Sequence, residues 1–272
     1  MDKLAVAMSV YKTDKLCFLQ QAVQSILSQT YTNFDLYIEV DGPVSDEVRE
    51  YLSLLHDEVN VFVNFNEKNL GLAFRLNQII DKVLKTKDYN FVARMDADDI
   101  SCPTRFDKQV GFLNSNTDIS IVGSDVIEFS EDGSVDFYKK MPSEHYSLVN
   151  NIVKRCPFNH PSVMFRIDVF EEHNLKYKDE LQNTQDYYLW VDAIKSGLKL
   201  ANINEPLLKF RIDDKFHSRR GVKKAKNDFN ARIYAIRELE LRSINNYLFS
   251  FVLFTLRLSP VMVKKWVYSK FR

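Results

Sequence analysis

The chain has 272 residues, enough for one large domain or two small ones with a sizeable core. It carries 37 basic and 37 acidic side chains, and this neutral balance argues against a dedicated nucleic-acid-binding protein, which usually has a basic excess. The three cysteines stand far apart with no Cys-x-x-Cys pair, so we expect no structural zinc site and a reducing compartment.

The first half of the chain alternates between strand and helix patterns. Residues 4–10 form an apolar strand pattern with no secretory signal before it, which favours a cytoplasmic enzyme. Further strands are predicted at 34–40, 59–65, 90–95 and 119–127, and apolar residues at helical spacing predict helices near 19–27, 48–55, 72–83 and 106–113. This alternation predicts an α/β fold with a mostly parallel sheet covered by helices, which would bind ligands at the carboxyl ends of its strands.

The second half is less regular. Strands are predicted at 162–165 and 198–203 and a helix at 185–195, and the chain reads as wholly helical from about residue 223. We therefore expect a catalytic domain over residues 1–222 and a helical C-terminal extension over residues 223–272.

Three carboxylates follow the strand predicted at 90–95, namely Asp96, Asp98 and Asp99. Carboxylates this close repel one another, and a divalent cation with a preference for oxygen ligands, Mg²⁺ or Mn²⁺, would offset the repulsion. Such a cation could also hold a diphosphate and neutralise a leaving group. The alternative is a solvated turn that caps the helix beginning near Pro103.

A second acidic residue, Asp41, ends the strand predicted at 34–40. A carboxylate in that position could accept a hydrogen bond from a base N–H group. The sequence Asp41-Gly42-Pro43 is equally typical of a plain turn.

Several segments, taken in order, match one known pattern. They are residues 6–11 (VAMSVY), 25–31 (SILSQTY), 69–77 (NLGLAFRLN), 95–99 (MDADD), the set Pro103, Arg105 and Gln109, and 184–190 (TQDYYLW). Over roughly residues 3 to 220 the chain resembles glycosyltransferase family two, the inverting group with a GT-A fold, and within it a bacterial surface-polysaccharide subgroup. Two departures are Val40-Asp41-Gly42-Pro43, where paired aspartates followed by Gly-Ser are common, and Gln185 in place of a glutamate.

The resemblance implies roles for individual residues. Asp186 is expected to be the catalytic base, and Asp96, Asp98 and His217 the metal ligands. The acceptor is expected to contact His160 and Trp190. The residues expected to bind the nucleotide sugar are Val10, Tyr11, Asp41, Asn69, Arg75, Arg94, Asp96, Ala97 and Arg211.

The chemistry of glycosyl transfer agrees with these roles. The reaction needs a stabilised diphosphate leaving group and a deprotonated acceptor hydroxyl, which the metal and Asp186 would supply. Simpler interpretations remain: Asp186 as a residue that favours a helix dipole, His160 as a structural histidine, Trp190 as a core residue, and the stretch from Arg211 to Arg220 as a solvated basic loop.

Two other functions are compatible with parts of this sequence. A phosphotransferase or phosphatase with an aspartyl nucleophile also uses Asp-x-Asp, but places it after the first strand and favours threonine or valine where this chain has Ile100. A non-catalytic sugar-nucleotide-binding homologue is disfavoured by intact Asp96, Asp98 and Asp186. The resemblance instead implies a hexosyltransferase that uses UDP-glucose or UDP-galactose. It would form a beta linkage to a polyprenyl-diphosphate-linked saccharide in O-antigen or capsule synthesis.

The C-terminal segment has an unusual composition. No acidic residue follows Glu240, whereas six basic residues do: Arg242, Arg257, Lys264, Lys265, Lys270 and Arg272. The uncharged run 243–256 is shorter than the roughly 20 residues of a spanning helix. We expect an interfacial helix that places the enzyme peripherally on the cytoplasmic face of the inner membrane; packing on the domain or on a partner subunit is the alternative.

Overall fold

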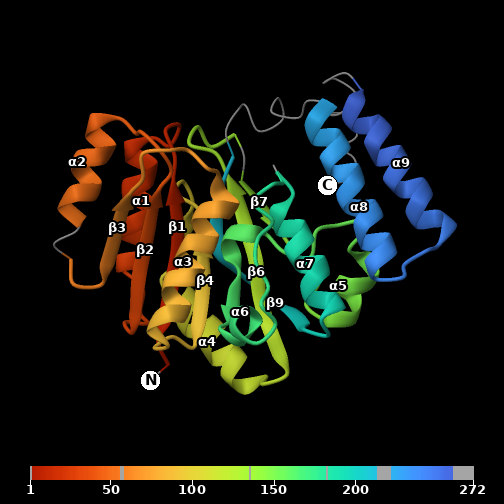
Figure 1. The fold of residues 1–272 in the computed structure, drawn as a ribbon, viewed down its shortest axis with the longest axis horizontal. Coiled ribbons are helices and arrows are strands. Elements are labelled where there is room, and N and C mark those ends of the chain that lie inside the picture. The colour runs from red at the N-terminus through yellow and green to blue at the C-terminus, as the bar shows by residue number, and fades with distance from the viewer. Residues whose placement is uncertain (1, 56–57, 135, 182, 213–221, 260–272) are drawn as a thin grey trace.

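The computed structural model describes residues 2–55, 58–134, 136–181, 183–212 and 222–259. One twisted sheet runs through the molecule, with helices on both of its faces (Figure 1). Its strands are β1 (Leu4–Val10), β2 (Phe34–Val40), β3 (Val61–Phe65), β4 (Phe91–Met95), β5 (Ile100–Ser101), β6 (Ile119–Phe129), β7 (Asp136–Lys139), β8 (Met164–Arg166) and β9 (Lys199–Arg211).

The helices connect these strands and close the chain at its C-terminal side. They are α1 (Leu16–Leu27), α2 (Asp46–Leu54), α3 (Leu72–Thr86), α4 (Arg105–Ser115), α5 (His145–Asn151), α6 (Asp168–Glu171), α7 (Gln185–Lys195), α8 (Val222–Glu238) and α9 (Ile244–Leu258), with a short 3₁₀ turn η2 (His160–Ser162). No helix within the described ranges is long and apolar enough to cross a membrane.

The strand order is β3-β2-β1-β4-β8-β6-β9-β5, with β7 on β6. The first four strands of this order are all parallel, because each is followed by a helical crossover. β8 then enters antiparallel between β4 and β6, and β9 returns parallel to β6. The predicted α/β fold with a mostly parallel sheet is confirmed, and the antiparallel insertions are additional.

Some elements differ from the prediction. β9 continues to Arg211, well past the predicted end at residue 203. Its middle contains Asn204, Glu205 and Pro206, a polar stretch with a proline that breaks the apolar pattern, and the β6–β9 register shifts beside it. β5 and β7 were also not predicted, because strands of two and four residues are too short to show a period.

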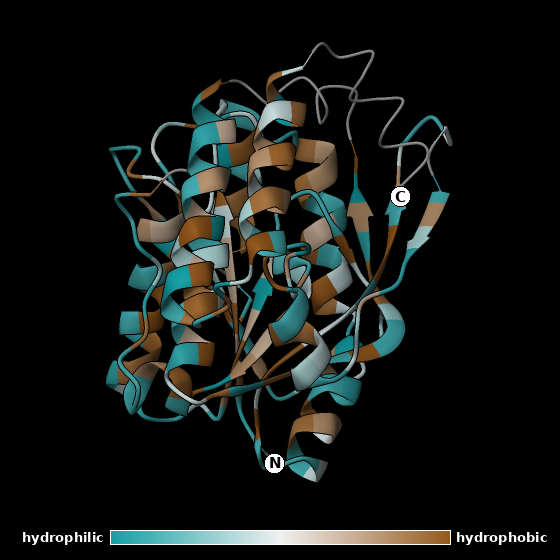
Figure 2. Cartoon of the chain, turned by 90° about the vertical axis from the view of Figure 1, so that its right-hand side faces the viewer, coloured by the Kyte–Doolittle hydropathy of each residue, from teal (hydrophilic) through white to brown (hydrophobic). Residues whose placement is uncertain are grey.

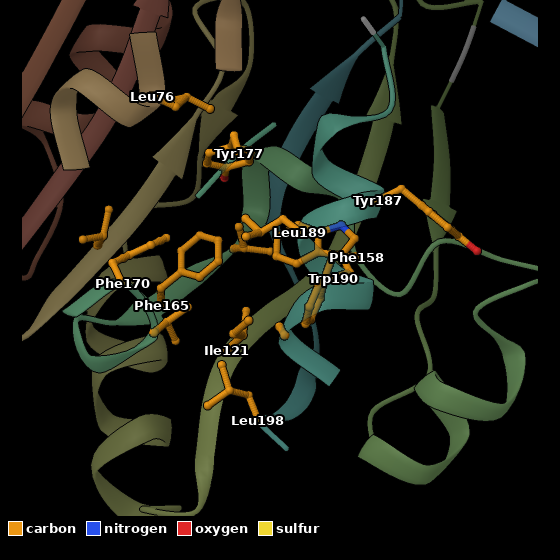
Figure 3. Packing of buried hydrophobic residues seen from close by; sticks show 14 of the residues in the cluster. Leu76, Ile121, Phe158, Phe165, Phe170, Tyr177, Tyr187, Leu189, Trp190 and Leu198 are labelled. Carbon is orange, nitrogen blue, oxygen red and sulfur yellow. The ribbon is translucent and has the colours of Figure 1, made fainter. Parts of the chain in front are cut away.

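The sheet separates two hydrophobic clusters. Along β1 the even-numbered residues, such as Val6 and Met8, face a cluster that includes α1 and α4, whereas Ala5 and Ala7 face one that includes α3 and α7. This alternation is the two-residue period of a strand buried on both faces. Figure 3 shows part of the second cluster, in which α7 packs over β6 and β8 around Trp190.

The two C-terminal helices differ in how deeply they are buried. Ala231, Ala235 and Ile236 of α8 belong to the same cluster as α7, so this helix extends the core of the catalytic domain. α9 packs on the outside of α8 and buries only Ser250 (Figure 1). The hydrophobic core therefore continues past residue 222 into α8.

Candidate active site

The carboxyl ends of β1, β2 and β4 meet at one edge of the sheet, because the three strands are parallel neighbours (Figure 1). A cleft of about 500 Å³ lies there, within the range of small-molecule sites. Its lining brings together seven of the residues predicted to bind the donor or the metal, which are Tyr11, Asp41, Asn69, Asp96, Ala97, Asp98 and Arg211.

The acidic cluster after β4 has the geometry of a cation site. Each of Asp96, Asp98 and Asp99 offers a carboxylate oxygen, and these oxygens lie within 4.8 Å of one another. Burial and the charge of Asp96 raise the pKa of the Asp98 carboxyl to about 7. Negative charge is therefore costly here, and a divalent cation with oxygen ligands fits the three carboxylates and would relieve that cost.

Asp99 faces inward and ties the acidic loop to β9. Its side chain is 1% exposed, and Oδ1 accepts a hydrogen bond of 2.8 Å from the backbone N–H of Arg211. Its Oδ2 has no hydrogen-bond partner among the described residues, so this oxygen is free to face a cation. Arg211 returns to the same loop, because its Nε donates to the Asp98 carbonyl at 2.6 Å.

The motif residues Arg105 and Gln109 support the acidic loop from behind. The fully buried Arg105 donates through Nη2 to the carbonyl of Arg94 at 2.8 Å and through Nε to Gln109 at 3.0 Å. Gln109 in turn donates to the carbonyl of Ser162 at 2.8 Å. Burial lowers the pKa of Arg105 to about 9. Arg105 and Gln109 of the Pro-x-Arg-x-x-x-Gln pattern thus have a structural role, because Arg105 holds the backbone at Arg94, two residues before Asp96.

Arg94 lies behind the cleft and does not line it. Its side chain is 2% exposed, and Nη2 forms an ion pair of 2.5 Å with Asp96. Its Nε and Nη1 have no hydrogen-bond partner among the described residues. Arg94 is therefore buried and paired with Asp96, and its predicted contact with the nucleotide sugar stays a prediction.

Asp41 stands across the cleft from the acidic cluster, and three groups donate hydrogen bonds to its carboxylate. Its Oδ1 accepts from the backbone N–H of Leu70 at 2.8 Å and from Nε of Arg75 at 2.7 Å, and its Oδ2 accepts from Gly71 N–H at 2.9 Å. Its own N–H donates to the Val10 carbonyl at 2.7 Å. Asp41 thus lines the cleft, whereas Val10 and Arg75 are buried and do not; their predicted contacts with the donor stay predictions.

The Asp41–Arg75 pair gives a stability prediction. Asp41→Ala should lower the free energy of unfolding by about 3 kcal/mol, because it leaves the Arg75 guanidinium buried without its counter-charge. Urea unfolding measures the change. The matched control is Asp81→Ala, which breaks the pair with Lys176 in which Asp81 is 46% exposed, and which should change stability by less than about 1 kcal/mol. Equal losses in the two variants would contradict this.

The same variant also tests nucleotide binding. If the Asp41 carboxylate faces a base N–H group, titration calorimetry should show weaker UDP binding by Asp41→Ala than by Asp81→Ala. Unchanged UDP affinity in a folded Asp41→Ala protein would remove Asp41 from the nucleotide site.

Asp186 lies beside the acidic cluster, as the second residue of α7. Burial raises the pKa of its carboxyl, and hydrogen bonds from backbone N–H groups at the start of the helix partly offset the rise. Arg94 and Asp96 are near enough to act electrostatically on this carboxyl. Asp186 is not among the residues that line the cleft, but a carboxylate with a raised pKa this near to Asp96 has the properties of a general base.

Near Asp186 lies the pair His160 and Tyr177, in which His160 Nε2 and the tyrosine hydroxyl are 2.9 Å apart. Burial and the charge of Arg94 hold the pKa of His160 well below its usual value, so the ring is neutral. Trp190 is fully buried and packs against Phe158 with ring centroids 4.9 Å apart (Figure 3). The structure favours a core role for Trp190 over the predicted contact with the acceptor.

The sequence prediction missed one wall of the cleft. The turn after β1 and the start of α1 supply four lining residues, which are Thr13, Asp14, Lys15 and Phe18. Leu72 and Phe210 also line the cleft. The Arg211 guanidinium lies 4.0 Å above the ring of Phe18. The sequence could have indicated this wall, because the turn follows the carboxyl end of a predicted parallel strand, where ligands bind. His217, Arg219 and Arg220 lie outside the described residues.

The sequence matches the family model described as "Glycosyl transferase family 2" over residues 5–173. The chain is 32% identical to the O-antigen biosynthesis glycosyltransferase WbnJ of Escherichia coli, over 91% of this chain and 93% of that protein. It is 30% identical to the amylovoran biosynthesis glycosyltransferase AmsE of Erwinia amylovora, over 98% of each.

A third relative is the UDP-Gal:alpha-D-GlcNAc-diphosphoundecaprenol beta-1,3-galactosyltransferase of Escherichia coli, with 29% identity over 98% of this chain and 96% of that protein. Among solved structures, S. aureus TarS in complex with UDP-GlcNAc has a TM-score of 0.67 and 14% identity, over 94% of this chain and 72% of that one. The mannosyltransferase PcManGT from Pyrobaculum calidifontis, in complex with GDP-Man and Mn2+, has a TM-score of 0.64 and 12% identity, over 98% and 79%. These two show the shared GT-A fold.

Proposed function

Because the chain belongs to glycosyl transferase family 2, and is a glycosyltransferase, we propose that its cleft transfers a hexose from a UDP-sugar, with inversion, to a saccharide acceptor. The observation that carries the proposal is the pairing of two carboxylate sites across one cleft. The acidic cluster of Asp96, Asp98 and Asp99 lies on one side and Asp41 on the other. This arrangement provides one place for the diphosphate of the donor and a separate place for its nucleobase.

Asp96 and Asp98 would hold Mn²⁺ or Mg²⁺, which when bound supplies positive charge to the diphosphate leaving group. Asp99 would contribute its free Oδ2 while its other oxygen keeps β9 in place. The mannosyltransferase PcManGT was solved with Mn2+, which supports the same class of ion here. The site residues themselves stay predictions until variants are measured.

Asp186, which is near enough to Asp96 to act on it electrostatically, would accept the proton of the acceptor hydroxyl. Its raised pKa makes it a stronger base than an exposed aspartate, and its position at the start of α7 keeps the carboxylate in place. The anomeric carbon would then be attacked from the side opposite the diphosphate, which inverts its configuration. His160, neutral and bonded to Tyr177, would line the acceptor side.

The acceptor is proposed by analogy with one of the relatives. The galactosyltransferase with 29% identity acts on a sugar linked to undecaprenyl diphosphate, and its match covers nearly the full length of both chains. We infer an acceptor of this class, a saccharide on a polyprenyl diphosphate, and a role in bacterial O-antigen or capsule synthesis. UDP-galactose and UDP-glucose are the favoured donors, with a beta linkage as the product of inversion.

A donor screen tests the proposal. The full chain is incubated with Mn²⁺, a lipid-linked GlcNAc acceptor and, in turn, UDP-galactose, UDP-glucose, UDP-GlcNAc and GDP-mannose, and the released nucleotide is measured. We expect acceptor-dependent release of UDP with a hexose donor and none in excess chelator. Release only from GDP-mannose would overturn the UDP-sugar assignment, and full turnover in chelator would overturn the metal assignment.

A further inference from the structure

The helix α9 carries its apolar residues on the outside. Six large apolar side chains of this helix are between 41% and 84% exposed, and they are Ile244, Tyr247, Leu248, Phe251, Val252 and Leu258. Their spacing of three and four residues places them on one face. The one fully buried residue among residues 244–258 is a serine, Ser250. This polarity is the reverse of that of an ordinary surface helix.

The opposite side of α9 is attached to α8. Phe229 and Phe254 have ring centroids 5.3 Å apart, and Arg257 forms an ion pair of 3.2 Å with Asp228. α8 is in turn continuous with the core, so α9 is held in a fixed orientation. Both helices lie at the right-hand side of Figure 1. Figure 2 looks onto that side and shows that hydrophobic residues alternate with hydrophilic ones along the helices. We call the six exposed residues of α9 the apolar face.

We propose that the apolar face docks on an anionic membrane surface, with α9 lying in the plane of the lipid interface. A cluster of exposed apolar side chains on a protein surface normally marks an interaction site. The 15 residues of α9 make a helix about 22 Å long, too short for the roughly 30 Å hydrocarbon core of a bilayer. A helix of this length and polarity is suited to lie at the interface, with its aromatic side chains at headgroup depth.

Charge selects an anionic membrane as the partner over a second copy of the chain. No acidic residue follows Glu240, whereas six basic residues do. The exposed Arg242 stands just before α9, and four of the six, with Trp266 and Tyr268, fall in the chain that continues past residue 259. Each basic residue near an anionic surface adds about 1 kcal/mol of attraction. A second copy would offer no negative charge from its own sequence after Glu240, because that sequence is the same in both copies.

The docking surface and the cleft lie apart. α9 is on the opposite side of the molecule from β1 and β2 (Figure 1), and no residue of α9 lines the cleft. Docking through α9 would therefore leave the cleft uncovered. The docking surface itself does not depend on the proposed function, because neither the apolar face nor the basic segment includes a residue of the cleft.

The test is sedimentation of the full chain with vesicles of phosphatidylcholine alone or mixed with phosphatidylglycerol. The double variant Leu248→Glu/Phe251→Glu replaces two central residues of the apolar face. The matched control is Tyr146→Glu, which changes an aromatic residue of α5 that is 80% exposed elsewhere. We expect the unmodified chain and the control to sediment with the mixed vesicles, and the double variant to bind at least roughly a hundredfold more weakly.

The alternatives give different results. If the unmodified chain stays in the supernatant with mixed vesicles, or if the double variant binds as well as the control, the proposal is overturned. A dimer in analytical ultracentrifugation that the double variant dissolves, without vesicle binding, would assign the face to a second copy. UDP release with a water-soluble acceptor should be the same in all three proteins. A loss there in every protein would count against the proposed function and not against docking.

Discussion

Replacement of Asp98 by alanine is expected to lower kcat on the order of a thousandfold. The carboxylate of Asp98 lines the cleft and belongs to the cluster of oxygens that lie within 4.8 Å of one another. Without it, the diphosphate loses the positive charge that the cation would bring to the leaving group. Turnover is measured as UDP release with the donor found in the screen.

Asp98 is a better choice than its neighbours for this test. Asp99 holds the backbone of Arg211, and Asp96 is paired with Arg94, so replacing either one would also disturb the loop. Among the described residues, the Asp98 carboxylate has no such hydrogen bond, and the variant should unfold at the same urea concentration as the unmodified chain. The control Asp118→Ala removes an exposed carboxylate paired with Lys199 and should leave turnover unchanged. Normal turnover in Asp98→Ala would remove the acidic cluster from catalysis.

The second large effect is expected for Asp186→Asn. This change keeps the size and hydrogen bonds of the side chain but removes its ability to accept a proton, so kcat should fall between a hundredfold and ten-thousandfold, as is typical of a lost general base. Donor affinity, measured with UDP, should stay nearly the same. A variant that turns over normally but binds UDP poorly would identify Asp186 as a binding residue.

Two further measurements separate a base from a residue that only favours a helix start. Asp46→Asn makes the same change in the first turn of α2, at a residue that does not line the cleft, and should leave kcat unchanged. The pH profile gives the second. Because burial raises the pKa of Asp186, the activity of the unmodified chain should be lost as the pH falls through a value above the usual range for aspartate. A profile that is flat down to pH 4 would speak against Asp186 as the base.

Much of the fold could be predicted because its elements have a clear period. β1 and β2 have the predicted bounds, and α7 covers the predicted residues 185–195. The strands buried on both faces read as apolar runs, and the helices between them repeat at 3.6 residues. β9 was predicted only in part. Its middle contains Pro206 and a bulge that break the apolar pattern, and the strand continues there because it pairs with β6.

The candidate site was predictable in its carboxylates and less so in its arginines. Strand ends indicate where Asp41 and Asp98 must lie, because topology alone brings them to one edge. Whether an arginine faces a ligand or a buried carboxylate depends on contacts between distant segments. Arg75 turned out to pair with Asp41, and Arg94 with Asp96, so both support the cleft from within. A single sequence shows the charge of these residues but not the direction of their side chains.

The link between Asp99 and β9 sets the order in which this enzyme can be completed during synthesis. The acidic loop emerges from the ribosome early, but the backbone N–H group that holds Asp99 belongs to Arg211, and β5 pairs with residues 208 and 209. A nascent chain that ends before residue 208 therefore lacks the partner that closes the loop. Asp96, Asp98 and Asp99 are present in such a chain, but their arrangement is not, so a truncated translation product would carry the acidic motif without its folded geometry.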